Sequence, residues 1–312
     1  MRIEYHRTLI ADRARNAAFQ KALASVIKRG ETIVADIGAG TGLMGLIAAK
    51  LGAAEVYLYE AAPVAAVAAE ILKLNRAQSC HLMPCHSTEM QDPPRADVVV
   101  SETLGNYALE ENIIDTVADA RRRHLKDGGI IIPGKISQFA APVVSDRIHR
   151  ELTLWDHVGF DLDLSPARIM SLNNVYVRSV EPEELLDKGA SARVWDEIDL
   201  SADSRSSRKG EASWKLSSRA TIYGFAYWWT AELVPGVVLS TAPGAARTHW
   251  EQLYFPLLQP IAGKRGETVM IALRSRSSEE AGTDLAWTAM QFDKDGRSLA
   301  RQALDLDKGW LP

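Results

Sequence analysis

The sequence has little cysteine, little excess charge and no long apolar run, and each shortage disfavours a class of protein. The two cysteines among 312 residues, Cys80 and Cys85, are too few for a disulfide framework, so we expect a reducing, cytoplasmic compartment. No segment approaches the ~18 consecutive apolar residues of a membrane span, so no membrane partner is expected. A net charge of −4 disfavours a nucleic-acid partner. A Gly-x-Ser-x-Gly nucleophile elbow is also absent.

The pattern changes at Pro133-Gly134, which indicates two domains. Residues 1–132 alternate helical and strand patterns, which is typical of a doubly wound α/β domain with a parallel sheet. Residues 133–312 carry β-branched and aromatic segments separated by Gly, Pro and Ser. All eight tryptophans lie in this second part, which predicts a β-barrel or β-sandwich with a large aromatic core.

Two polar features are predicted to be structural rather than functional. The pairs Cys80-His81 and Cys85-His86 bracket a short strand whose alternation would send the cysteines to opposite faces, so no metal is expected. The stretch Ser201–Ala212 is predicted to be a solvated loop. Its basic side chains, which would serve solubility, are Arg205, Arg208 and Lys209.

A short apolar strand, a glycine-rich turn and a helical stretch follow one another over 32–51. The turn is Asp36-Ile37-Gly38-Ala39-Gly40-Thr41-Gly42. Glycines let the backbone approach a ligand closely, and a helix N-terminus adds N–H donors and the positive end of its dipole. A dinucleotide fingerprint would place its third glycine at position 43, where this chain has Leu43. The turn therefore favours a cofactor without a pyrophosphate.

Glu60 follows the next predicted strand, Glu55–Tyr59. An acid at this place can accept hydrogen bonds from both hydroxyls of a ribose. Alone, the glycine turn is also compatible with a tight turn in another doubly wound fold. Together with Asp36 and Glu60, it indicates S-adenosylmethionine.

Two glutamates flank the loop after the predicted strand Ala96–Val100. Glu102 is expected beside the cofactor, because ligands bind at the carboxyl ends of the strands in such sheets. Glu111 ends the loop, which could return it to the same site. Paired carboxylates suit the planar, always charged guanidinium of arginine. For Glu111 alone, as for Glu110, the alternative is an ordinary acid in the first turn of a helix.

These motifs resemble those of the protein arginine methyltransferase family over nearly the whole chain. Residues 101–111 are similar to its double-glutamate loop, and Thr248-His249-Trp250 resembles its Thr-His-Trp loop. The resemblance implies a Rossmann-like class I methyltransferase domain at 1–132, with a short N-terminal helix, and a β-barrel substrate domain at 133–312. It implies S-adenosylmethionine as cofactor and a guanidinium nitrogen of arginine, in a protein or peptide, as methyl acceptor.

The resemblance also implies roles that spacing alone does not assign. Arg15 would pair with the cofactor's carboxylate, and Asp12 would pair with His249 across the domain junction and help take the released proton. The implied catalytic residues are Glu102, Glu111, His249 and Asp12. The implied cofactor-binding residues are Arg15, Asp36, Gly38, Gly40, Gly42, Glu60, His6 and Glu89, which would accept from the adenine amine. The implied substrate-binding residues are Glu102, Glu111, Trp250 and Tyr5.

The stretch Trp155-Asp156-His157-Val158-Gly159-Phe160-Asp161 resembles the start of the family's dimerisation arm, expected at about 152–172. Its apolar side chains would be exposed unless something covered them, which usually marks an interface. We therefore expect a homodimer in which the arm docks on the partner's nucleotide domain.

Several departures from the family pattern leave alternatives open. Fewer residues precede Asp12 than in the family's N-terminal helix, so Tyr5 and His6 are expected to supply only part of the lid. Thr103 stands where the family often has a bulkier residue, and Ile113 where it often has methionine. One alternative substrate is free arginine or another small guanidino or amino compound. Another alternative is a catalytically silent dimeric binding module.

Overall fold

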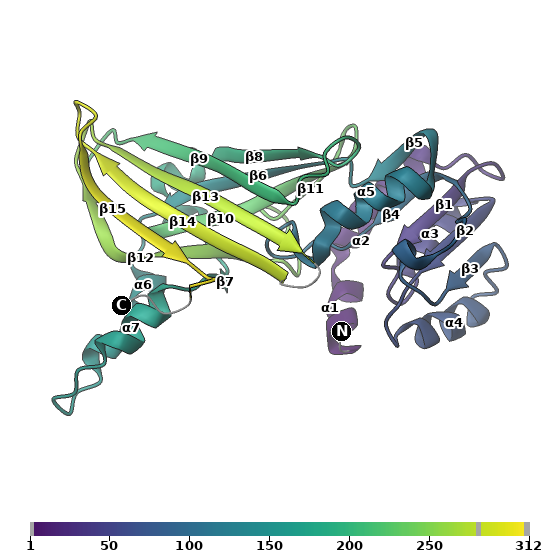
Figure 1. Ribbon diagram of the computed structural model, residues 1–312, viewed down its shortest axis with the longest axis horizontal. Coiled ribbons are helices and arrows are strands. Elements are labelled where there is room, and N and C mark those ends of the chain that lie inside the picture. The colour runs from purple at the N-terminus through teal and green to yellow at the C-terminus, as the bar shows by residue number, and fades with distance from the viewer. Residues whose placement is uncertain (1–2, 279–281, 309–312) are drawn as a thin grey trace.

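The molecule consists of an α/β domain and a β-rich domain that lie side by side, with the helix at the N-terminal end between them (Figure 1). The structure is a computed structural model that describes residues 3–278 and 282–308. Within these residues, no helix combines the length and the apolar character needed to cross a membrane.

The first domain contains a parallel sheet with the strand order β3-β2-β1-β4-β5. β1 is central, and β2 and β4 pair with it on opposite sides. The carboxyl ends of β1 and β4 therefore form the switch point where such folds bind ligands. In chain order the elements are α1 (Ile3–Ala11), α2 (Arg13–Val26), β1 (Ile33–Ile37), α3 (Leu43–Leu51), β2 (Glu55–Tyr59), α4 (Ala65–Leu74), β3 (Cys80–Met83), η1 (Ser87–Glu89), β4 (Ala96–Ser101), η2 (Glu110–Asn112), α5 (Ile113–Arg123) and β5 (Leu125–Ile132).

The second domain consists of two antiparallel sheets. One has the order β7-β12-β10-β6-β8 with β11 paired to β10, and the other has the order β15-β14-β13-β9. The strands are β6 (Lys135–Val143), β7 (Tyr176–Arg178), β8 (Arg193–Asp199), β9 (Ser207–Lys215), β10 (Ala220–Val234), β11 (Val237–Ser240), β12 (Gln252–Gly263), β13 (Thr268–Ser278), β14 (Gly282–Phe292) and β15 (Ser298–Asp305). The predicted aromatic core is confirmed, because buried aromatic side chains from both sheets belong to one cluster that includes Trp195, Trp214, Phe225, Trp229 and Trp287.

A helical segment interrupts the β-rich domain between β6 and β7. It comprises α6 (Arg147–Leu152), η3 (Leu154–His157) and α7 (Ser165–Leu172), and it projects away from the barrel in Figure 1. The side chains of Leu154, Phe160 and Leu162 are 61%, 86% and 62% exposed. An apolar cluster this open is unusual for a face that stays in water.

The prediction of a solvated loop at Ser201–Ala212 is wrong in its second half. β9 begins at Ser207, and Arg208 is only 6% exposed. The strand alternates, with Ser207, Lys209 and Glu211 outward and Arg208 and Ala212 inward. An arginine on the inward face removed the apolar alternation by which strands are recognised.

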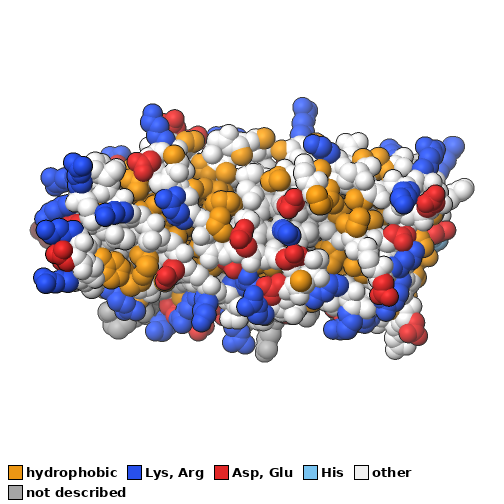
Figure 2. Space-filling view, turned by 90° about the horizontal axis from the view of Figure 1, so that it is seen from above, with side chains coloured by type: hydrophobic (Ala, Val, Ile, Leu, Met, Phe, Trp, Pro, Cys, Tyr) orange, Lys and Arg blue, Asp and Glu red, His pale blue; other side chains and the backbone are white. Residues whose placement is uncertain are grey.

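The surface mixes charges of both signs. On the face drawn in Figure 2, Lys and Arg side chains are interspersed with Asp and Glu side chains and with small apolar patches. This distribution provides no continuous basic surface there for a polyanion, in keeping with the net charge of −4.

Candidate active site

The glycine turn after β1 forms one wall of the site. Gly38 and Gly40 have φ angles of 72° and 55°, which side-chain-bearing residues rarely adopt. The N–H groups of Gly40 and Ala62 each donate to the carboxylate of Glu60 at 2.7 Å. These bonds hold the carboxylate at the end of β2, and each oxygen keeps a lone pair for another donor.

Asp36 is buried at the end of β1. Its Oδ2 accepts a 2.8 Å hydrogen bond from the N–H of Gly45, in the first turn of α3. Burial raises the pKa of Asp36 to about 7, although the Gly45 N–H and the charge of Arg15 oppose this. Asp36 therefore ties the strand to the helix beneath the glycine turn.

Glu102 and Arg15 form a buried ion pair. Their side chains are 5% and 6% exposed, and the pair uses Oε2 of Glu102. Burial lowers the pKa of Arg15 to about 10, while nearby Asp12 opposes the shift. Oε1 of Glu102 is buried and has no hydrogen-bond partner among the described residues. Leaving such an acceptor unpaired is costly, so this oxygen marks a place where a donor is required.

The adjacent acids Glu110 and Glu111 have different environments. Glu110 turns back into its own loop, where it accepts from the N–H groups of Asn106 (3.2 Å) and Tyr107 (3.5 Å). Glu111 lies exposed at the mouth of the cavity with a left-handed φ of 57°. The pKa of Glu111 is raised, first because the surrounding protein removes water from its carboxylate and second because of the negative charge of Glu60. It is thus Glu111, not Glu110, that faces the same cavity as Glu102.

The Thr-His-Trp segment joins the β-rich domain to the N-terminal helices. Oδ2 of Asp12 accepts from the backbone N–H of His249 at 2.7 Å and from its Nδ1 at 2.8 Å. Oδ1 of Asp12 caps α2 through the N–H of Arg15 at 2.9 Å. Because a carboxylate only accepts, His249 carries its proton on Nδ1, and its buried Nε2 has no partner among the described residues. Burial lowers the pKa of His249, although Asp12 opposes the shift.

The double-glutamate loop, residues 101–111, is held by side chains from the β-rich domain. The indole N–H groups of Trp250 and Trp229 donate to the carbonyls of Leu104 and Gly105, both at 3.0 Å. Tyr227 Oη accepts from the N–H of Ala108 at 3.1 Å, and Tyr107 Oη bonds Ser275 Oγ at 2.5 Å. Sequence reasoning missed Tyr227, Trp229 and Ser275, because they belong to ordinary strands far away in the chain.

Helix α1 covers the cavity. Tyr5 and His6 line it, and ring atoms of His6 lie 3.3 Å from the place a Cβ would occupy at Gly40. Tyr5 also packs edge-on against His249, with 6.1 Å between ring centroids. Helix α1 therefore contributes at least these two side chains to the wall of the cavity.

The cavity collects most of the predicted site residues, but not all of them. Its lining includes Tyr5, His6, Arg15, Asp36, Gly38, Gly40, Glu60, Glu102 and Glu111. The prediction that Trp250 contacts substrate is not supported, because its ring is 2% exposed and packs under the double-glutamate loop. Gly42 faces Leu58 instead of the cavity.

Three other predicted residues also lie outside the cavity lining, namely Asp12, His249 and Glu89. Glu89 is exposed on η1, where its Oε2 accepts from the N–H of His86 at 3.3 Å. Its contact with adenine stays a prediction. Among the described residues, no group of three or more His, Cys, Asp or Glu side chains could hold a metal ion.

Comparison with known proteins identifies the family. Residues 135–295, more than half of the chain, match the family model described as the arginine methyltransferase oligomerization subdomain. The chain belongs to the protein arginine methyltransferase family. Residues 19–158 of this arginine methyltransferase also match the model described as ribosomal protein L11 methyltransferase, which overlaps the α/β domain.

Curated relatives agree with this assignment. Protein arginine N-methyltransferase 6 of Xenopus tropicalis is 30% identical over 80% of this chain and 77% of its own length. A probable protein arginine N-methyltransferase 6.1 of Oryza sativa subsp. indica is 30% identical over 89% of this chain and 82% of its own length.

Solved structures confirm the predicted fold. The Trypanosoma brucei PRMT1 enzyme-prozyme heterotetrameric complex with AdoHcy matches with a TM-score of 0.85 and 22% identity, covering 96% of this chain and 97% of that one. The match spans both domains and therefore supports an α/β methyltransferase domain followed by a β-rich domain.

Proposed function

We propose that this arginine methyltransferase transfers a methyl group from S-adenosylmethionine to a guanidinium nitrogen of arginine in a protein or peptide. The observation that carries the proposal is the buried, unpaired Oε1 of Glu102, which lies at the switch point in the same cavity as Gly40 and Glu60. A protein or peptide substrate is favoured over free arginine because the curated relatives are named as protein methyltransferases.

The cavity residues divide into two groups around the reacting atoms. Glu60 would accept from the ribose hydroxyls, and Arg15 would pair with the cofactor's carboxylate, since both already hold fixed positions in the wall. Glu102 and Glu111 would hold the guanidinium from two sides. Their charges favour localisation of the positive charge on the nitrogens they contact, which leaves the attacking nitrogen richer in electrons.

The cofactor, when bound, supplies a sulfonium whose methyl group is already activated for transfer. The protein therefore contributes mainly alignment and charge placement. The acceptor nitrogen gains the methyl group and loses a proton. We propose that the Asp12–His249 pair helps take this proton, because the depressed pKa of His249 leaves Nε2 free as an acceptor near neutral pH.

A methyl-transfer assay with matched substrates tests the proposal. The enzyme and cofactor are incubated with an arginine-containing peptide, with the same peptide carrying lysine, and with free arginine, and the products are weighed by mass spectrometry. A gain of one or more methyl masses on the arginine peptide alone is expected. Methylation of free arginine alone would show that the substrate is free arginine and not a protein or peptide. The absence of methyl transfer to all three compounds would overturn the enzymatic function.

We propose further that the chain forms a cytoplasmic homodimer through the helical arm. The oligomerization-subdomain match and the exposed Leu154, Phe160 and Leu162 support the interface, and the free cysteines Cys80 and Cys85 support a reducing compartment. Light scattering should give twice the chain mass of 34.3 kDa at micromolar concentration. A monomer under these conditions would contradict the proposal, and cell fractionation tests the compartment.

A further inference from the structure

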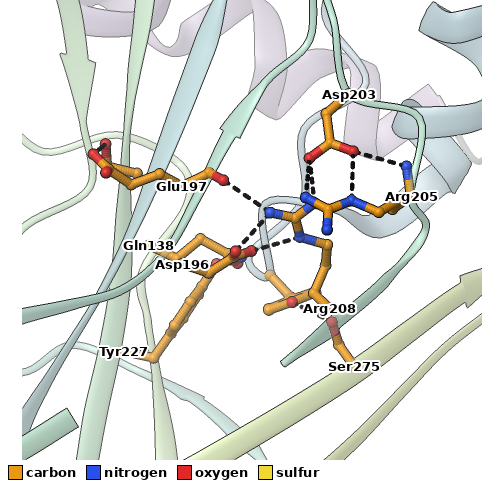
Figure 3. Close-up of polar contacts among 10 residues, drawn as sticks. Gln138, Asp196, Glu197, Asp203, Arg205, Arg208, Tyr227 and Ser275 are labelled. Carbon is orange, nitrogen blue, oxygen red and sulfur yellow. Dashed lines mark hydrogen bonds and ion pairs between the residues drawn. The ribbon is translucent and has the colours of Figure 1, made fainter. Parts of the chain in front are cut away.

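Arg208, on the inward face of β9, is buried between the carboxylates of Asp196 and Asp203 (Figure 3). Its Nε and one terminal nitrogen donate to Asp196 at 2.9 and 2.6 Å, and its other terminal nitrogen donates to Asp203 at 2.6 Å. The carbonyl of Glu197 accepts a further bond at 2.8 Å. The guanidinium is therefore held in one orientation by four hydrogen bonds.

A contribution to stability does not by itself explain the buried cluster of Arg208, Asp196 and Asp203. Removing these charges from water costs free energy, and their mutual attraction often does no more than offset that cost. Apolar residues of similar volume would stabilise the fold as well. The side chains of Arg208, Asp196 and Asp203 are 5%, 9% and 13% exposed. A cluster with this cost is better explained if it fixes the position of something else.

A chain of hydrogen bonds leads from the cluster to the double-glutamate loop. Oδ2 of Asp196 accepts from Nε2 of Gln138 at 2.8 Å, and Oε1 of Gln138 accepts from the hydroxyl of Tyr227 at 2.7 Å. The hydroxyl oxygen of Tyr227 in turn accepts from the backbone N–H of Ala108 at 3.1 Å. Gln138 and Tyr227 are fully buried, so water cannot replace these partners.

A second connection reaches the helix that follows the loop. Asp203 belongs to the turn after β8, and the carbonyls of Leu200 and Asp203 in that turn accept from Arg121 at 2.8 and 3.3 Å. Arg121 lies on α5, which begins directly after η2 and Glu111. The cluster thus connects to the chain on both sides of Glu111.

We propose that Arg208 is a positioning residue for the guanidinium clamp, acting through Asp196, Gln138 and Tyr227 to hold residues 104–111. The inference rests on the proposed function of Glu111. Within the described part of the chain, none of the hydrogen-bond partners of Arg208 lines the cavity, so its proposed effect on the clamp is indirect. Its fork orients Asp196 so that one carboxylate oxygen receives Gln138, and the amide can then accept from Tyr227 only with its other end.

Two variants interrupt the series of hydrogen bonds between Arg208 and Ala108 at different places. Arg208→Lys keeps the charge and loses the fork, and Gln138→Met keeps the volume and removes both hydrogen bonds of the amide. Arg205→Lys is the matched control, because Arg205 pairs with the same Asp203 but its side chain is 77% exposed. Gln138→Met leaves the charged cluster complete, so it serves as the test if Arg208→Lys does not fold.

Amide hydrogen exchange gives a readout that does not depend on activity. In Arg208→Lys and in Gln138→Met, exchange in 104–111 should become about tenfold faster, with exchange in β1 unchanged, because only the loop loses its support. The control should match the wild type. Unchanged exchange in 104–111 in a folded variant would overturn the proposal, as would acceleration of the whole molecule to the same degree.

Kinetics provide the second readout. Turnover of the arginine peptide should fall about tenfold or more in each variant, because small misplacements of a reacting group are costly, while the cofactor Kd stays within about twofold. The variant that carries both Arg208→Lys and Gln138→Met should be no slower than the slower single variant, because both substitutions interrupt the same series of hydrogen bonds. If the losses of turnover in the two single variants add up in the double variant, the proposed hydrogen-bonded connection is wrong. An inactive wild type would overturn the proposed function instead, while the exchange result would still test the positioning.

Discussion

Glu111→Gln is the substitution that tests the clamp with the least disturbance of the protein. Glu111 is exposed, whereas Glu102 is paired with the buried Arg15. Removing the charge of Glu102 would leave a buried cation without its partner, at a cost of about 3–5 kcal/mol in stability. Removing that of Glu111 should change the free energy of unfolding by less than about 0.5 kcal/mol.

The loss of activity follows from what a carboxamide offers a guanidinium. Truncating one partner of a hydrogen-bonded charge pair costs about 2–5 kcal/mol. Because Glu111 lies at the open mouth of the cavity, we expect the lower part of this range, about 2–3 kcal/mol. At 1.36 kcal/mol per factor of ten, kcat/KM for an arginine peptide should fall about 30- to 150-fold.

The assay is steady-state methylation of one arginine peptide, with cofactor affinity measured by calorimetry and stability by urea unfolding. Only the methylation rate should change. Glu110→Gln is the control, because the amide oxygen of the glutamine can still accept from the N–H of Asn106 or Tyr107. Its methylation rate should fall only a few-fold. If Glu111→Gln stays within about threefold of the wild type while Glu110→Gln is slow, the clamp has been assigned to the wrong acid.

Three further outcomes follow from other parts of the structure. Glu60→Ala should weaken cofactor binding at least about tenfold, because two hydroxyl-to-carboxylate bonds are lost; unchanged calorimetric affinity in the folded variant would refute the ribose assignment. The raised pKa of Asp36, about 7, means that the folded apoprotein holds a proton that the unfolded chain releases near pH 4. The free energy of unfolding should therefore fall by about 1.4 kcal/mol for each unit by which the pH rises between these two values. Asp36→Asn should remove that slope, as measured by urea unfolding at several pH values. Phe160→Asp should place a charge in the exposed arm and give a monomer by light scattering, whereas an unchanged mass would exclude this part of the arm from the interface.

The local part of the site was predictable from the sequence. Gly38, Gly40 and Glu60 directly follow two largely apolar strands, so their place at the carboxyl edge of the sheet follows from the strands that precede them. Glu102 follows β4 in the same way. In each case the cavity residue lies within a few positions of the strand that places it.

The support of the site was not predictable, because it depends on partners from distant strands. Trp229 lies 124 positions from the Gly105 carbonyl it binds, and Tyr227 lies 119 positions from Ala108. Nothing in the pattern of β10 distinguishes these two rings from other core aromatics. For Arg208, the available signal was the alternation of exposed and inward residues along β9, which becomes visible once an inward arginine is allowed.

The Thr-His-Trp segment shows why the two domains must act together. His249 binds Asp12 over 237 positions, and Trp250, the next residue, binds the Leu104 carbonyl over 146 positions. One short segment of the β-rich domain therefore fixes both the start of α2, which carries Arg15, and the loop that carries Glu102 and Glu111. Because Arg15 and Glu102 are also paired with each other, a shift of this segment would move both side chains together. Every residue that lines the cavity belongs to the α/β domain. The β-rich domain therefore acts on the cavity indirectly, through its hydrogen bonds to Asp12 and to the Leu104 carbonyl.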